Sequence, residues 1–202
     1  MPLIYQIPRS CLLAPASAYG SMDAIIAARR TMSRKPTLYL AGPAVFHPAA
    51  KALFQYLKEI CAENGLEGVS PLDGEGKWQN LPQEQQAAAI RQANIDLIRA
   101  CDAVIACISP FRGPGADAGT AWEMGFAEAL GKPVFSWCEE TRPYLERVEH
   151  QRDDDGRCFC QQHGMIVEDF GLVDNLMLTA GRFPPLPEFD QVIKQAAAEL
   201  KG

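Results

Sequence analysis

The chain has 202 residues, of which 48% are hydrophobic and 22% are charged, and its formal net charge at pH 7 is −6. This length and composition are typical of one well-buried globular domain, and they exclude a disordered chain or a comfortable pair of domains. The negative net charge argues against a nucleic-acid polymer as partner, because phosphate backbones bind to basic surfaces.

The first 34 residues differ in pattern from the rest of the chain. The stretch IPRSCLLAPASAYGS mixes prolines with small residues and has no helical or strand periodicity. We therefore expect residues 1–34 to form an N-terminal extension outside the core, and residues 35–202 to form the globular domain. CLLAPASA is short and follows no strongly basic segment, so we do not expect a secretory signal.

From Thr37 onward, apolar strand-like runs alternate with helical patterns. The expected strands are TLYLAG, LEGVSP, DAVIACIS and PVFSWC, which begin at residues 37, 66, 102 and 133. DAVIACIS is continuously apolar, which is typical of a parallel strand covered on both faces. The β-α-β-α-β-α-β order predicts an α/β fold with one doubly wound parallel sheet of the flavodoxin or Rossmann type.

Helical spacing predicts the buried faces of the first two helices between these strands. The side chains expected to face the core are Leu53, Tyr56, Leu57 and Ile60, then Ile90, Ala93, Leu97 and Ile98. A further helix is expected after Asp117, and EFDQVIKQAAAEL predicts a closing amphipathic helix. The segment 71–84 is polar and long for a connection, which indicates a functional loop. Residues 139–170 show only charges and turns, and DNLML is a short apolar element.

Seven cysteines are present, and Cys61 and Cys107 lie in apolar runs. This pattern is typical of reduced, partly buried thiols, so we expect a cytoplasmic protein without a disulfide framework. Cys158, Cys160 and His163 have a C-x-C-x-x-H spacing that lacks a second ligand pair, so we expect a plain loop rather than a metal site. No apolar stretch approaches the ~18 residues of a membrane-spanning helix, and no membrane contact is expected.

Three loops converge beyond the carboxyl ends of the predicted strands, where such sheets bind ligands. They are AGPAVFHP, PLDGEGKW and SPFRGPGADAGTAWE. Neither G-x-G-x-x-G nor G-K-[ST] is present, and the carboxylate that ends FRGPGAD would repel a phosphate. Carboxylates suit a sugar centre better, because anionic oxygens stabilise the oxocarbenium-like state of glycosidic cleavage.

Three acids in this region could carry such chemistry. Asp117 occupies a helix N-cap position, Glu123 lies six residues further along the same helix, and Asp96 is flanked by apolar residues. Each also has a structural interpretation. Asp117 could serve only as a cap, Glu123 could pair with Arg112, and Asp96 could pair with Arg99 at i+3.

Taken together, several short motifs resemble the nucleoside 2-deoxyribosyltransferase family. They are YLAGP, the Asn94-Ile-Asp96 stretch, CDAVIA, SPFRG, D-x-G-T-A-x-E-x-G, ALGKPV and DNLML, in this order from about Thr37 to Leu178. Singly, CDAVIA or ALGKPV would be weak signals. Jointly the set is specific.

The resemblance implies a ping-pong exchange between a 2′-deoxynucleoside and a free nucleobase, as used in nucleotide salvage. By the family's pattern Glu123 is the nucleophile, which forms a covalent deoxyribosyl-glutamate intermediate. Asp117 and Asp96 fall on acids that contact base and sugar and assist proton transfer. Tyr39 matches the tyrosine that orients the nucleophile, and Gly42 of YLAGP is placed at the substrate.

The family also implies a homo-oligomer whose active sites are completed by a neighbouring subunit. Asn175 and Met177, in the N-L-M of DNLML, match residues that reach into the neighbour's site and hold the 5′ end of the sugar. No cofactor and no metal are implied. The loop from Leu72 to Gln83 matches no base-reading pattern, so Asp73 and Trp78 are only candidates, and the choice between purine and pyrimidine bases stays open.

Two other functions remain open. One is a deoxynucleoside 5′-monophosphate N-glycosidase, a hydrolase with the same fold and glutamate, which would need a Ser/Arg/Gly-rich phosphate pocket after the first strand. AGPAVFHP offers neither serine nor arginine, although Arg112 could bind a phosphate. The other is a non-catalytic nucleotide-binding sensor, in which Glu123 serves structure only.

Overall fold

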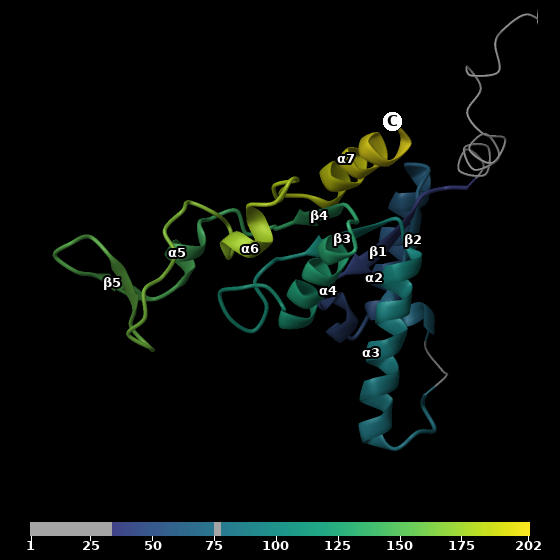
Figure 1. Cartoon of the computed structure of the whole chain (residues 1–202), viewed down its shortest axis with the longest axis horizontal. Helices are drawn as coiled ribbons and strands as arrows, with labels where there is room; N and C mark the ends of the chain where they lie inside the picture. Colours follow the sequence, from purple (N-terminus) through teal and green to yellow (C-terminus); the bar gives the residue numbers. More distant parts are fainter. Residues whose placement is uncertain (1–33, 75–77) are drawn as a thin grey trace, which may run out of the picture. The chain divides into compact units, whose positions relative to one another are not determined.

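The computed structural model of the protein describes residues 34–74 and 78–202 (Figure 1). The predicted N-terminal extension lies outside these ranges except for Arg34, so its boundary stays a prediction. Residues 36–202 form one compact unit. This unit is the single α/β domain that the sequence predicts.

Four parallel strands form the central sheet, in the order β2-β1-β3-β4. Their bounds are β1 Thr37–Ala41, β2 Glu67–Val69, β3 Ala103–Cys107 and β4 Val134–Trp137. The predicted doubly wound sheet is confirmed, and each observed strand lies within the apolar run in which it was expected. The strand order reverses between β1 and β3, so the loops that follow these two strands diverge there and leave space for a ligand.

Helices cover both faces of the sheet (Figure 1). The long helices are α2 Ala50–Glu63, α3 Gln83–Ala100, α4 Ala118–Ala129 and α7 Phe189–Lys201. Side chains of β1 alternate between the faces: Leu38 and Leu40 pack with α2 and α7, whereas Tyr39 packs with α3 and α4. Tyr39 therefore points to the same face as Glu123.

The sequence did not predict the short elements. They are the 3₁₀ helices η3 Pro43–Phe46 and η4 Pro71–Gly74, the helices α5 Tyr144–Arg147 and α6 Leu176–Thr179, and an antiparallel pair, β5 His150–Arg152 and β6 Cys158–Cys160. The strand pair lies in the middle of the charged stretch 139–170. Three-residue strands and four-residue helices are too short to leave a periodic pattern.

The predicted inward faces of α2 and α3 need correction. In α2 the buried side chains include Phe54 and Cys61, whereas Tyr56 is 60% exposed. In α3 the buried ones are Ile95 and Ile98, and Ile90 is 40% exposed. The reason in α3 is that its first half extends past the sheet, as Figure 1 shows, and Ile90 there lines a cavity instead of packing in the core.

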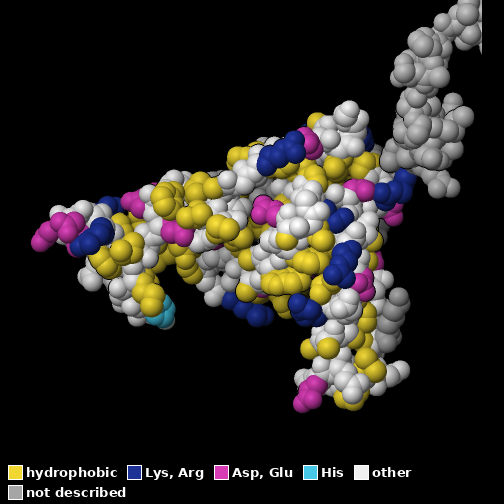
Figure 2. Space-filling view, viewed as in Figure 1, with side chains coloured by type: hydrophobic (Ala, Val, Ile, Leu, Met, Phe, Trp, Pro, Cys, Tyr) yellow, Lys and Arg dark blue, Asp and Glu magenta, His cyan; other side chains and the backbone are white. Residues whose placement is uncertain are grey.

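Exposed hydrophobic side chains gather over the segment from β5 to α6 (Figure 2). The most exposed are Met165, Ile166, Phe170 and Met177. Within residues 34–74 and 78–202, the helices are all too short or too polar to cross a membrane.

Candidate active site

A tyrosine from the sheet and a glutamate from a helix meet at the centre of the site. The Tyr39 hydroxyl donates a hydrogen bond to Glu123 Oε1 at 2.6 Å, although 84 residues separate the two. β1 holds the tyrosine and α4 holds the glutamate, so two rigid elements fix this contact. The structure thus brings together the two residues that the sequence analysis named as nucleophile and orienting group.

Burial perturbs both groups. The pKa of Glu123 is raised to about 7, mainly because burial disfavours the charged carboxylate; the hydrogen bond from Tyr39 lowers it and the charge of Asp117 raises it. Burial also raises the pKa of Tyr39, and the nearby Glu123 adds to this effect. The tyrosine hydroxyl therefore keeps its proton at neutral pH, while the glutamate ionises in the physiological range.

The start of α4 places a second carboxylate beside this pair. Asp117 is the N-cap, and its Oδ2 accepts hydrogen bonds from the Thr120 backbone N at 2.9 Å and the Thr120 hydroxyl at 3.1 Å. The predicted cap is therefore present. Capping uses only Oδ2 among the described contacts of Asp117, so Oδ1 is available to a ligand.

Glu123 and Asp117 line one cavity of about 350 Å³. Its other lining residues are Gly42, Val45, Phe46, Pro71, Leu72, Trp78, Ile90, Asn94, Gly119 and Thr120. A second cavity, of about 450 Å³, adjoins it and shares Ile90, Asn94, Gly119 and Glu123. A mostly apolar cavity with a few convergent polar groups is typical of a small-molecule site.

The backbone at Gly42 admits no other residue. Its φ is +151°, and a Cβ there would lie 2.8 Å from Cβ of Cys107. Gly42 therefore lets the chain leave β1 directly against β3 and turn along the wall of the cavity.

The assignment of Asp96 as a site residue is corrected by its position. Its side chain is 63% exposed, accepts a hydrogen bond from Gln92 Nε2 at 2.9 Å and pairs with Arg99 at 3.8 Å. It lines neither cavity at Glu123. Two residues along a helix turn a side chain by about 200°, so Asn94, and not Asp96, faces the site.

Sequence analysis missed Asn94. Its Oδ1 is buried and has no hydrogen-bond partner among the residues that the structure describes. A buried amide oxygen left without a donor costs about 1–3 kcal/mol, so such atoms often mark a ligand position. The signal that could have found it was present, because Asn94 stands in the same short stretch as Asp96.

The remaining candidates are divided. Trp78 lines the cavity, whereas the Asp73 carboxylate accepts from the Ser70 backbone N at 2.9 Å and pairs with Lys58, away from Glu123. The alternative pairing of Glu123 with Arg112 is not observed. The Arg112 guanidinium lies over the rings of Phe111 and Phe46, at 4.6 and 5.0 Å.

Asn175 and Met177 do not line the cavity of their own chain. Asn175 caps α6, where its Oδ1 accepts from the Met177 backbone N at 3.0 Å and its Nδ2 donates to Glu168 at 2.6 Å. The Met177 side chain is 75% exposed.

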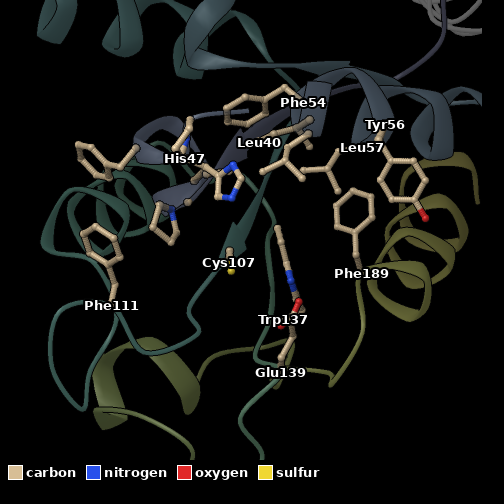
Figure 3. A pocket seen from close by; sticks show the side chains of 17 residues that line it. Leu40, His47, Phe54, Tyr56, Leu57, Cys107, Phe111, Trp137, Glu139 and Phe189 are labelled. Carbon is tan, nitrogen blue, oxygen red and sulfur yellow. The ribbon is translucent and has the colours of Figure 1, made fainter. Parts of the chain in front are cut away.

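A larger apolar cavity, of about 560 Å³, lies on the opposite face of the sheet (Figure 3). Leu40, Phe54, Trp137 and Phe189 line its floor, and Glu139 is its one carboxylate. It shares Gly42 and Phe46 with the site at Glu123. We place the chemistry at the smaller cavity, because Asp117 and Glu123 both line it and Glu123 accepts a hydrogen bond from Tyr39.

A family model described as nucleoside 2-deoxyribosyltransferase matches residues 38–177. The chain belongs to the nucleoside 2-deoxyribosyltransferase family. The matched region runs from β1 to α6 and so contains every residue of the cavity at Glu123, together with Asn175 and Met177. The resemblance of the motifs is thereby confirmed.

Two solved structures show the same fold as this nucleoside 2-deoxyribosyltransferase family member. A 2-desoxiribosyltransferase from Leishmania mexicana is 35% identical with a TM-score of 0.66, and the alignment covers 81% of this chain and 97% of that one. A conserved protein from Enterococcus faecalis V583 is 22% identical with a TM-score of 0.50, covering 81% and 99%. The second likeness shows the fold alone.

Among curated proteins, an uncharacterised protein from Schizosaccharomyces pombe is 42% identical over 119 residues. The alignment covers 58% of this chain and 56% of the yeast protein. This family member therefore spans little more than half the length of that relative.

Proposed function

We propose that the protein transfers the 2-deoxyribosyl group of a 2′-deoxynucleoside to another nucleobase, with retention and by a ping-pong mechanism. The observation that carries the proposal is the partly buried Glu123, with a pKa of about 7, hydrogen-bonded to Tyr39 in a cavity that Asp117 also lines. A carboxylate poised near neutral pH beside a second carboxylate suits nucleophilic cleavage of a glycosidic bond.

In the first half-reaction, a Glu123 oxygen attacks C1′ of the deoxyribose and the C1′–N bond breaks. The departing nitrogen keeps the bonding electrons and takes up, through Asp117, the proton that Glu123 holds below pH 7 and passes to Asp117 as it attacks. In the second half-reaction, the incoming base returns a proton to Asp117 as its nitrogen attacks C1′, and Glu123 leaves as a carboxylate. The Tyr39 hydroxyl holds the Glu123 oxygen in place and stabilises its charge whenever it is not bonded to the sugar.

One incubation tests this function. A deoxynucleoside such as deoxyadenosine is mixed with a different base, such as hypoxanthine, and the products are separated by chromatography. Base exchange predicts a new deoxynucleoside, and slower release of free sugar when no acceptor is present. The hydrolase alternative predicts no exchange and a requirement for the 5′-phosphate, whereas a sensor predicts no turnover. Either outcome would contradict the transferase.

The two polar residues of α3 should contribute unequally to this reaction. Replacing Asn94 with leucine should lower kcat/KM about tenfold, because one hydrogen bond to substrate, worth about 1–1.5 kcal/mol, is lost. Asp96→Asn on the same helix should change kcat/KM less than twofold, because this side chain is solvated. Steady-state kinetics on both variants checks the pair, and a larger loss for Asp96→Asn would reverse the assignment.

We further propose that the enzyme is a homo-oligomer in which Asn175 and Met177 enter a neighbouring subunit's site. The absence of both residues from the lining of their own chain's cavity and the exposure of Met177 support this arrangement. At substrate concentrations below the KM of the wild type, Asn175→Ala and Glu123→Ala should each show a low exchange rate on their own. Co-expressed in equal amounts, they should recover about a quarter of the wild-type rate, because random pairing places both intact residues in one site of four. Absence of recovery would favour sites built from one chain.

The compartment that best fits this activity is the cytoplasm, where it would serve nucleotide salvage. The six cysteines of the described ranges are free thiols, which suits a reducing environment. Cell fractionation of the tagged protein provides the measurement.

A further inference from the structure

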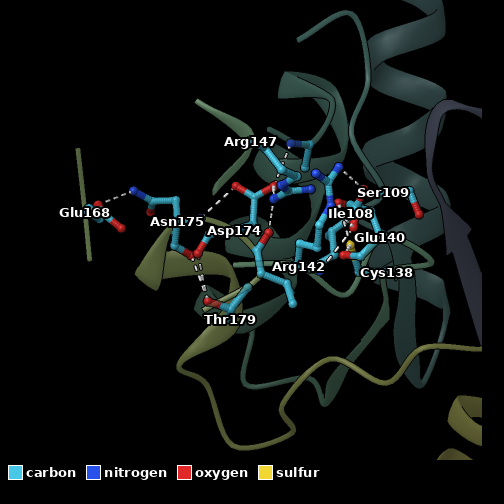
Figure 4. Close-up of polar contacts among 12 residues, drawn as sticks. Ile108, Ser109, Cys138, Glu140, Arg142, Arg147, Glu168, Asp174, Asn175 and Thr179 are labelled. Carbon is cyan, nitrogen blue, oxygen red and sulfur yellow. Dashed lines mark hydrogen bonds and ion pairs between the residues drawn. The ribbon is translucent and has the colours of Figure 1, made fainter. Parts of the chain in front are cut away.

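A buried carboxylate outside the cavity joins two segments of the proposed site (Figure 4). Asp174 is 4% exposed, and both of its oxygens are used. Oδ2 accepts a hydrogen bond from the Ala116 backbone N at 2.8 Å, across 58 residues of sequence. Oδ1 accepts one from the Asn175 backbone N at 2.7 Å. One side chain thus contacts the residue before Asp117 and the backbone of Asn175.

The loop between β3 and α4 is held close to this carboxylate. A Cβ at Gly115 would lie 3.5 Å from Asp174 Oδ1, in ordinary van der Waals contact, so this glycine lies beside the carboxylate. Ala116 directly precedes Asp117, the N-cap that fixes the first turn of α4. A hydrogen bond at Ala116 therefore sets where α4 begins, and with it the position of the Asp117 carboxylate.

On the other side, Asp174 fixes the start of α6. Its backbone carbonyl accepts a hydrogen bond from the Thr179 hydroxyl at 3.2 Å, and Asn175 caps the same helix. Glu168 contacts this segment too, but only through the Asn175 side chain and the Leu176 backbone N. Asp174 contacts both segments, whereas Glu168 contacts one.

Arg147 supplies the opposite charge. Its side chain is 5% exposed, its guanidinium lies 3.9 Å from Asp174 Oδ2, and it donates a hydrogen bond to the Val173 carbonyl. This buried ion pair contributes little to the free energy of unfolding, because the cost of desolvating both charges offsets most of their attraction. A buried pair that also holds two backbone segments is better explained by the geometry that it imposes.

We propose that Asp174 is a positioning residue of the transferase, which aligns Asp117 of its own site and Asn175 with one buried carboxylate. The inference rests on the proposed function, because it assigns the alignment a role in the reaction. If Asn175 serves the neighbouring subunit, the same carboxylate links the geometry of two active sites.

A double-mutant cycle tests this role. Asp174→Asn replaces one acceptor oxygen with a donor and should lower kcat/KM about 100-fold, the loss expected when a reacting group moves by about 1 Å. If Asp174 acts through Asp117, the double variant Asp117→Asn/Asp174→Asn should be slower than Asp117→Asn only by the part of the loss that arises at Asn175, which Glu168→Gln measures. Effects that multiply fully in the double variant would overturn the proposal.

Glu168→Gln is the matched control. It perturbs Asn175 but not the loop before α4, so its effect should multiply with that of Asp117→Asn. Asp174→Glu is the second variant, because it keeps the charge beside Arg147 and so protects the fold. The longer side chain displaces the carboxylate, so we still expect at least a tenfold loss of kcat/KM; a rate within twofold of the wild type would contradict positioning.

Hydrogen exchange separates this proposal from the proposed function. In Asp174→Asn the peptide that covers residues 110–118 should exchange faster, and in Glu168→Gln it should not. If the wild type shows no base exchange, the transferase proposal fails, yet the exchange of this peptide still decides whether Asp174 holds the loop. Unchanged protection in Asp174→Asn would overturn the inference.

Discussion

Glutamine at position 123 should abolish base exchange, with a loss of at least about 10⁴-fold, because an amide oxygen cannot form the ester to C1′. Glutamine has nearly the same shape and can still accept the Tyr39 hydrogen bond, so the fold should be retained. Glu128→Gln, an exposed position on the same helix, is the matched control and should keep the wild-type rate. Residual exchange above a hundredth of the wild-type rate in Glu123→Gln would require another nucleophile.

The intermediate itself can be trapped. An analogue of the deoxynucleoside with fluorine at C2′ of the sugar slows both half-reactions. The glycosyl-enzyme should therefore accumulate and add the mass of one fluorinated sugar to the protein. Peptide mapping should place this mass on Glu123. An adduct on a different residue, or none under conditions where the base is released, would contradict the covalent step.

Glu123→Gln should also change the pH dependence of the free energy of unfolding. The folded pKa of Glu123 is about 7 and lies above its usual value near 4.5, so the native state holds a proton that the unfolded chain has lost between these pH values. Ionisation of the buried group therefore lowers the free energy of unfolding by up to about 3 kcal/mol above pH 7, and by nothing below pH 4.5. Glu123→Gln should consequently melt higher than the wild type at pH 8 and at nearly the same temperature at pH 4.5.

Asparagine at position 117 should lower kcat about 10²- to 10³-fold, which is the usual contribution of one acid–base group. Asparagine still caps helices well, so α4 should begin at the same residue. The loss should depend on the leaving base. With 7-methyl-2′-deoxyguanosine the departing base is already cationic and needs no proton, so Asp117→Asn should approach the wild-type rate.

Single-turnover measurements with both nucleosides provide the check. Equal losses for deoxyadenosine and the methylated nucleoside would show that Asp117 acts by binding or charge and not by proton transfer. Asp117→Ser, which also caps but carries no carboxylate, is the control for the cap itself. It should match Asp117→Asn with deoxyadenosine, whereas a fully active serine variant would leave the carboxylate without a role.

Sequence patterns predicted the sheet because β1, β3 and β4 are apolar runs whose burial leaves little choice of structure. They also marked Asp117 and Glu123 as candidates, because a cap followed by an acid in an apolar helix is unusual, and the family resemblance supplied the roles that we propose for them. The error at Asp96 has a geometric cause. Asn94 and Asp96 lie on different sides of α3, and the first half of this helix extends past the sheet, so residue type and periodicity could not indicate which side faces the cavity.

Long-range contacts could not be predicted from the sequence for a different reason. The hydrogen bond from Ala116 to Asp174 joins the loop before α4 to the residue that precedes the N-cap of the four-residue helix α6, and neither segment has a periodic pattern that fixes its path. The strand pair β5–β6 is likewise only three residues long on each side. Such segments are positioned by individual hydrogen bonds, which a sequence does not display.

Because Glu123 is partly buried, the negative charge that the proposed reaction needs also lowers the free energy of unfolding. Because the ionised carboxylate weakens the native state at neutral pH, screening a library of variants for heat resistance alone would enrich glutamine at this position and discard the nucleophile. Engineering of this protein for higher thermal stability should therefore keep Glu123 and introduce substitutions on surfaces far from the cavity.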